Sequence, residues 1–148
     1  MIHRGSRGER GFRVLPHTAD KAIEAWGRSL PDLFCAAAEG MLSQSEDLAA
    51  VSREREWTIE VEADSGEELL HAWLSELLWV AERDEAVPCE CEIRELSEGP
   101  WRLKGLARGG PPPSEARHTG APVKAVTYHQ LRIWQDEGLW QAHLVFDV

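Results

Sequence analysis

The stretch SLPDLFCAAAEGMLS, residues 29–43, carries the clearest helical signal in the chain. Its apolar residues recur at intervals of three and four, as on one face of an amphipathic helix; they are Leu30, Leu33, Phe34, Ala37, Ala38, Met41 and Leu42. Ser29 can cap the first turn, and Pro31 is tolerated there because the first helical amides lack partners. The spacing therefore predicts a helix that begins at Ser29, ends near Ser43 and buries one face.

Regular patterns continue on both sides of this helix. A second helical stripe follows Asp64 or Ser65, and it comprises Leu69, Leu70, Trp73, Leu74, Leu77, Leu78 and Ala81. Alternating or short apolar segments predict strands over residues 12–17, 22–27, 55–63, 87–96, 101–107, 123–134 and 140–148. This order predicts an α+β fold, a two-layer sandwich in which two helices pack on one face of a mostly antiparallel sheet. Most of the seven tryptophans fall at inward positions of these elements.

The length of 148 residues fits one domain, which we expect over residues 12–148 after a disordered basic tail at 1–11. The stretch ARGGPPPSEARHTGAP, residues 107–122, predicts a long exposed loop because it holds three consecutive prolines and two glycines. The basic start lacks the apolar segment of a secretory signal, and the three cysteines are expected to be reduced thiols in the cytoplasm. Cys89 and Cys91 are interpreted as core residues.

Charge limits the classes of partner. The chain has 16 basic and 26 acidic residues, a net charge of −10. Residues 1–13 hold four arginines and one glutamate, so the remainder carries 12 basic and 25 acidic residues, or −13. A body this acidic repels a phosphate backbone, so we expect no direct DNA binding and only indirect contact with RNA. No apolar run is long enough to span a bilayer, and no phosphate-binding loop or nucleophile elbow is present.

Carboxylates at the ends of predicted elements are the candidate cation ligands. Asp20 follows a short strand and Asp47 follows the first helix, while Asp147 and the Val148 carboxylate are forced together by covalent geometry. A hard divalent cation with oxygen ligands would offset that repulsion. The alternative is that these last residues simply extend into water.

Lys124 and three histidines are the other candidates. In regular alternation Lys124 shares a face with Val126 and Tyr128, and it could pair with acidic side chains or reach a phosphate or acidic group of a partner. His17, His118 and His129 lie at strand ends or loop boundaries, where structural hydrogen bonding is the commoner role. We expect His71 and His143 to be ordinary surface residues.

Four segments resemble the archease family: HTADKAIEAWGRSLPDLF (17–34), LLHAWLSELLWV (69–80), PVKAVTYHQL (122–131) and FDV (146–148). The similarity runs from about residue 12 to the last residue. It implies a small non-catalytic activator of the GTP-dependent RNA-splicing ligase, which joins 3′-phosphate to 5′-hydroxyl RNA ends. Archeases promote the guanylylated state of that ligase and its repeated turnover.

The resemblance also implies a divalent-cation site, typically for calcium. The matching residues are Asp20, Asp47 and Asp147, with a contribution from Val148, and Lys124, His17 and His129 as partner-activating residues. The family often has Met-Thr-Asp after the first helix, where this chain has Ser45-Glu46-Asp47, so Glu46 is an alternative ligand.

Two other functions remain open. One is a general chaperone or interaction module, which would need exposed apolar surface. The other is a small enzyme that uses His17, Asp20, His129 and Asp147 as acid and base.

Overall fold

The computed structural model describes residues 10–15, 21–113 and 122–148. His17, Asp20 and His118 therefore lie outside the described residues, as do residues 1–9 of the expected tail. Arg10 is described, and its guanidinium donates to Glu39 Oε1 at 2.7 Å.

The elements follow the order expected from the sequence. They are β1 (Gly11–Leu15), β2 (Lys21–Gly27), α1 (Leu30–Leu42), the 3-10 turn η2 (Leu48–Ala50), β3 (Arg55–Ala63), α2 (Gly66–Asp84), β4 (Val87–Ser97), β5 (Trp101–Gly110), β6 (Ala125–Val126), β7 (Arg132–Asp136) and β8 (Leu139–Asp147). The predicted cap of α1 is confirmed, because the amide of Asp32 donates to Ser29 Oγ at 3.2 Å. The second helix is capped by Ser65 in the same way.

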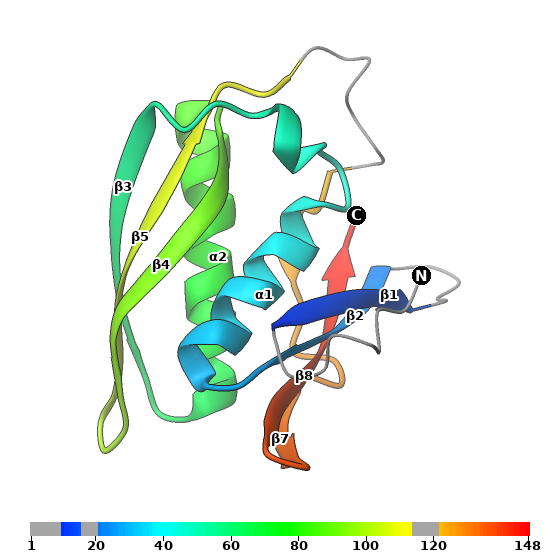
Figure 1. Cartoon of the computed structure of the whole chain (residues 1–148), viewed down its shortest axis with the longest axis vertical. Coiled ribbons are helices and arrows are strands. Elements are labelled where there is room, and N and C mark those ends of the chain that lie inside the picture. Colours follow the sequence, from blue (N-terminus) through cyan, green and yellow to red (C-terminus); the bar gives the residue numbers. More distant parts are fainter. Residues whose placement is uncertain (1–9, 16–20, 114–121) are drawn as a thin grey trace.

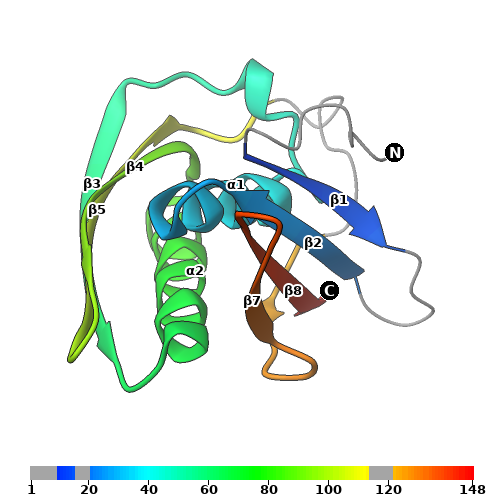
Figure 2. The same ribbon diagram turned by 60° about the horizontal axis from the view of Figure 1, so that its bottom comes forward.

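The strands form two antiparallel sheets. One has the order β1-β2-β8-β6, with β7 also paired to β8, and the other has the order β3-β5-β4. Both helices lie between the sheets (Figures 1 and 2). α1 contacts β1 and β2 on one side and β4 on the other, while α2 contacts β3 as well as β6 and β7. The α+β class with two helices and antiparallel sheets is confirmed, but the strands divide into two sheets instead of the single sheet expected.

The core fills the space around the two helices. The largest side chain with no exposed surface is Trp73 of α2, whose Nε1 donates to the carbonyl oxygen of Phe34 in α1 at 3.1 Å. Each inward residue predicted for α1 from Leu33 to Leu42 is buried. Trp26 is also buried, whereas Trp79, which is not part of the predicted apolar stripe of α2, is 53% exposed.

The predicted loop at 107–122 is wrong at its start, because β5 continues to Gly110. A β-carbon on Gly109 would collide with the carbonyl oxygen of Val87, and one on Gly110 would collide with Ser52 Oγ. Here glycine permits close approach of backbone and side chain within a sheet. The two glycines therefore belong to a tightly packed strand end.

The predicted strand over 123–134 is also wrong as one continuous element. Thr127 Oγ1 accepts the amide of His129 at 3.2 Å, and the amide of Leu131 donates to the Tyr128 carbonyl at 3.3 Å. Such local hydrogen bonds compete with strand pairing. They turn the chain between β6 and β7, so that Val126 is 5% exposed and Tyr128 is 65% exposed. The expected alternation of Lys124, Val126 and Tyr128 on one face does not hold.

Of the two helices in the described part of the chain, neither is both long and apolar enough to cross a membrane.

Candidate functional site

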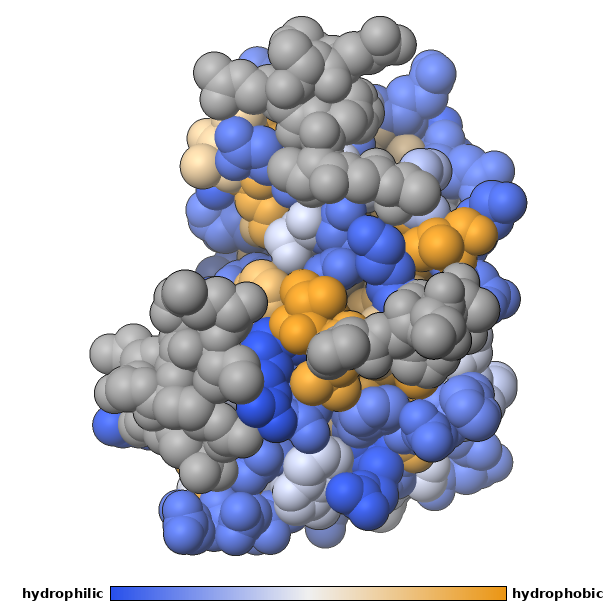
Figure 3. Space-filling model, turned by 90° about the vertical axis from the view of Figure 1, so that its right-hand side faces the viewer, coloured by the Kyte–Doolittle hydropathy of each residue, from blue (hydrophilic) through white to orange (hydrophobic). Residues whose placement is uncertain are grey.

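The end of β8 is flanked by a strand on each side. Ala125 of β6 is the Cα partner of Asp147, and the amide of Lys124 donates to the Asp147 carbonyl at 2.8 Å. On the other side, Lys21 of β2 is the Cα partner of Phe146. Asp147 and Lys124 are both exposed. Figure 3 shows the side of the molecule that lies on the right in Figure 1, where hydrophobic residues reach the surface among hydrophilic ones.

The segment after α1 supplies two further acidic residues. Asp47 caps η2, and its Oδ1 accepts the amide of Ala49 at 3.2 Å. Glu46 and Lys124 both line a surface groove, which is described below. Within residues 10–15, 21–113 and 122–148, no group of three or more histidine, cysteine, aspartate or glutamate side chains is placed to hold a metal ion.

A groove of about 650 Å³ lies between α2, the end of α1 and the segment around β6. Buried residues such as Met41, Leu42 and Val126 form its apolar part. Its polar lining includes Glu46, Lys124, His71, Ser75, Glu82 and Glu85. Trp79 also lines the groove.

One stripe of α2 is fastened to the backbone of β6 and β7. His71 Nε2 donates to the Val126 carbonyl at 2.8 Å, and Glu67 Oε2 accepts the amide of Ile133 at 3.2 Å. The neutral ring that donates from Nε2 can accept at Nδ1, where Ser75 Oγ lies 3.4 Å away. The His71 ring also stacks on Tyr128, with centroids 4.0 Å apart and planes 9° apart.

His71 is partly exposed, as expected, but the prediction missed its contacts with β6 and the turn that follows. Glu67, His71, Ser75 and Trp79 recur at intervals of four in a helix whose other stripe is apolar. This spacing in the sequence could have predicted that α2 has a second face that contacts other elements.

His129 and His143 have local roles. His129 is exposed in the turn after β6. His143 Nδ1 lies 3.0 Å from the Gln130 carbonyl, which fits a structural contact between β8 and that turn. Since His17 and Asp20 are outside the described residues, the four-residue acid–base arrangement considered above stays a prediction.

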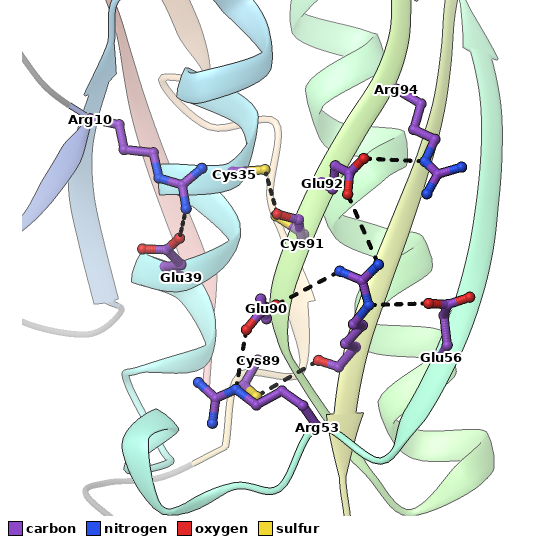
Figure 4. A network of polar contacts seen from close by, with 11 residues as sticks. Arg10, Cys35, Glu39, Arg53, Glu56, Cys89, Glu90, Cys91, Glu92 and Arg94 are labelled. Atoms are coloured by element: carbon purple, nitrogen blue, oxygen red, sulfur yellow. Dashed lines mark hydrogen bonds and ion pairs between the residues drawn. The ribbon is translucent and has the colours of Figure 1, made fainter.

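The cysteines pack in the interior, as expected. Cys35 and Cys89 are buried and Cys91 is partly buried, and Cys35 Sγ donates to the Cys91 carbonyl at 3.4 Å (Figure 4). Interaction between the two thiol side chains lowers the pKa of the Cys35 thiol and raises that of the Cys91 thiol. These contacts join α1 to β4.

Acidic and basic side chains alternate across the outer sheet beside them. Arg108 of β5 lies 3.1 Å from a carboxylate oxygen of Glu56, 3.7 Å from one of Glu90 and 4.0 Å from one of Glu92. Exposed pairs of this kind contribute little each. We interpret the network as stabilisation of the three-stranded sheet.

Comparison with known proteins agrees with the fold. The model of the Archease protein family matches residues 12–148. A protein archease from Methanopyrus kandleri is 37% identical over 140 residues, which cover 93% of this chain and 99% of that one. A second, from Methanosarcina mazei, is 35% identical over 145 residues, with 97% and 99% covered.

Two solved structures are similar. The solution structure of protein 1598 from Methanobacterium thermoautotrophicum has a TM-score of 0.77 and 28% identity, and the match covers 93% of this chain and 99% of that one. A crystal structure from Thermotoga maritima, described as an archease and possible chaperone, has a TM-score of 0.60 and 20% identity, with 92% and 96% covered, and shows the likeness of fold. The family match over residues 12–148 and the identity with the two curated relatives lead to one conclusion: this chain belongs to the archease family.

Proposed function

We propose that this chain is a non-catalytic, cytoplasmic activator of the GTP-dependent RNA-splicing ligase that joins 3′-phosphate to 5′-hydroxyl RNA ends. In this role it promotes guanylylation of the ligase and multiple turnover in tRNA splicing or RNA repair, and it meets RNA only through the ligase. Family membership is the observation that carries the proposal. The acidic body, with its net charge of −13 outside residues 1–13, suits a protein partner better than a nucleic acid.

The proposed activator holds a divalent cation, with calcium as the first candidate, through Asp20, Asp47, Asp147 and a main-chain oxygen of Val148. The donor chemistry fits, because these are all oxygen ligands. The pairing of Lys21 in β2 with Phe146 in β8 supports the assignment. Asp20 directly precedes Lys21 in the sequence, and Asp147 directly follows Phe146. The described residues alone provide no complete ligand group, so the proposal requires Asp20.

Lys124 adds a positive side chain to this acidic edge. It is exposed, and its backbone is held to Asp147 by the 2.8 Å amide–carbonyl hydrogen bond. We propose that Lys124 meets a phosphate or a carboxylate at the ligase active site, with His17 and His129 beside it. The cation would neutralise the aspartates so that this edge can approach a nucleotide-bearing partner.

Ligation with limiting cognate ligase tests the function. The substrate is RNA with 3′-phosphate and 5′-hydroxyl ends, supplied with GTP, and the yield of joined RNA per ligase is measured with and without this chain. We expect more than one turnover only with the chain, and no product from the chain alone. Equal yields with and without the chain would exclude the activator, and product from the chain alone would favour the enzyme.

Calorimetry tests the cation site separately. We expect Asp147→Asn and Asp20→Asn each to weaken calcium binding by at least tenfold, because each removes a charged oxygen ligand. Asp136→Asn is the matched control, since Asp136 lies at the other end of the β7–β8 pair. Unchanged calcium affinity in both site variants would rule out these ligands.

A general chaperone is the second candidate, and the exposure of Trp79 and Tyr128 favours it. A chaperone of this kind should suppress heat aggregation of unrelated proteins at stoichiometric concentration. A ligase activator should leave their light scattering unchanged.

A further inference from the structure

The exposed hydrophobic side chains concentrate around the groove beside α2. Four large hydrophobic residues are exposed in the described part of the chain: Val14, Trp79, Tyr128 and Val148. Trp79 lines the groove, and Tyr128 stacks on His71, which also lines it. Val148 follows Asp147, whose Cα partner Ala125 is a third lining residue. Three of the four exposed hydrophobic residues therefore line the groove or contact or adjoin elements that line it.

The groove can admit a side chain of another molecule. Its volume of about 650 Å³ lies within the range of ~300–1,000 Å³ that is typical of ligand pockets. The guanidinium of Arg83 lies 4.3 Å from the centroid of the Trp79 ring, a cation–π contact. An exposed aromatic side chain beside an apolar hollow is typical of the residues that dominate binding energy at interfaces.

Charge indicates what kind of segment would enter. The charged lining residues are Glu46, Glu82 and Glu85 against Lys124 alone, a net charge of −2. The helix that forms the wall, α2, holds five acidic residues and one basic residue, a net charge of −4. Complementary potentials favour a positively charged partner. Proteins that bind RNA carry basic surface patches, so an RNA ligase meets this requirement.

We infer that the groove between α2 and β6 is where this chain holds the ligase, by taking an apolar or aromatic side chain of the ligase flanked by arginine or lysine residues. This inference rests on the proposed function, because the occupant is the partner named there. It separates two tasks: the groove provides affinity, while the edge around Asp147 and Lys124 provides activation. Lys124 and Ala125 line the groove and also adjoin Asp147, so the two surfaces meet at this segment.

Binding of the full chain to the cognate ligase tests the inference. We expect Trp79→Ala to raise the dissociation constant by at least tenfold, because it removes the aromatic anchor. Glu82→Lys should raise the dissociation constant by a similar factor, mainly because association becomes slower at low salt. Val14→Ala is the control for the first variant, since Val14 is 46% exposed on β1, three strands away from β6. Glu98→Lys, in the exposed β4–β5 turn, is the control for the second.

Hydrogen exchange gives a readout that needs no variant. Ligase binding should slow amide exchange over residues 123–126, which line the groove, and leave the β4–β5 turn unchanged.

The possible outcomes separate the two proposals. If the wild-type chain binds and activates the ligase while Trp79→Ala and Glu82→Lys bind equally well, the groove is wrong and the activator stands. If the wild-type chain neither binds nor activates the ligase, both are wrong. If sedimentation shows that Trp79→Ala dissociates a dimer of this chain without changing ligase affinity, the occupant is a second copy and the inference is overturned.

Discussion

Replacing His71 tests how the backbone of β6 is held at the candidate site. β6 has two residues, and among the described strands it pairs with β8 alone. The Val126 carbonyl is buried and receives a hydrogen from His71 Nε2 at 2.8 Å. The ring of His71 also stacks on Tyr128. Two substitutions separate these contributions: His71→Phe keeps an aromatic ring without a donor, and His71→Gln keeps an amide donor without a ring.

The expected losses of unfolding free energy differ. A buried carbonyl left without its donor costs about 1–3 kcal/mol, so we expect His71→Phe to lose roughly this amount. An aromatic pair contributes about 0.5–1.5 kcal/mol, and since Tyr128 is 65% exposed we expect His71→Gln to lose an amount near the lower limit. Ser75→Ala should lose less than about 0.5 kcal/mol, because a bond of 3.4 Å is long.

Urea denaturation followed by tryptophan fluorescence measures these losses, and hydrogen exchange over residues 123–131 locates them. Exchange in this segment should accelerate in His71→Phe and stay near the wild-type rate in His71→Gln. Equal losses in the two variants, or a larger loss in His71→Gln, would show that the hydrogen bond to Val126 is not what holds β6.

Three further predictions concern the framework. Gly109→Ala should cost at least ~1–3 kcal/mol in urea denaturation, because its β-carbon would collide with the Val87 carbonyl, whereas Gly66→Ala at the first position of α2 should be nearly neutral. Hydrogen bonds from Arg83 and then Trp57 lower the pKa of Asp84 from its ordinary 3.8 to about 2. Its contribution to stability is thus present above pH 4 and lost as the pH falls to 2, so the stability difference between wild type and Asp84→Asn should shrink over that interval. Burial raises the pKa of Glu39 against the opposing effect of Arg10, so ionisation of Glu39 disfavours folding, and Glu39→Gln should gain stability relative to wild type as the pH rises from 4 to 7; a constant difference would contradict this.

Local patterns in the sequence predicted most of the fold because they depend on neighbouring residues. Ser29 and Ser65 cap their helices, and the alternation of residues 55–63 matches β3. The errors arose where a tertiary contact outweighed local preference. Gly109 and Gly110 indicate a loop when read alone, but they extend β5 because Val87 and Ser52 pack against them.

The candidate site could be predicted only in part. The pairing of β6 with β8 brings the backbone of Lys124 next to Asp147, a neighbour that the sequence alone did not specify. The role of His71 depends on Val126, which is 55 residues away in sequence, and no local pattern encodes that contact. The turn after β6 depends on the Thr127 hydroxyl, which donates to the Val145 carbonyl at 3.1 Å and accepts the His129 amide. The alternation of apolar and polar residues carries no information about such a side-chain hydrogen bond.

The shortness of β6 explains why α2 matters to the proposed cation edge. Two residues of pairing cannot by themselves fix a strand, because ordering each residue costs ~1–2 kcal/mol of conformational entropy and each hydrogen bond returns only about 0.5–1.5 kcal/mol. The bond from His71 to Val126 and the bond between Lys124 and Asp147 act on the same short segment, from opposite sides. The position of Lys124 relative to Asp147 thus depends on α2, and a partner that fills the groove against α2 would also order the edge where activation is proposed.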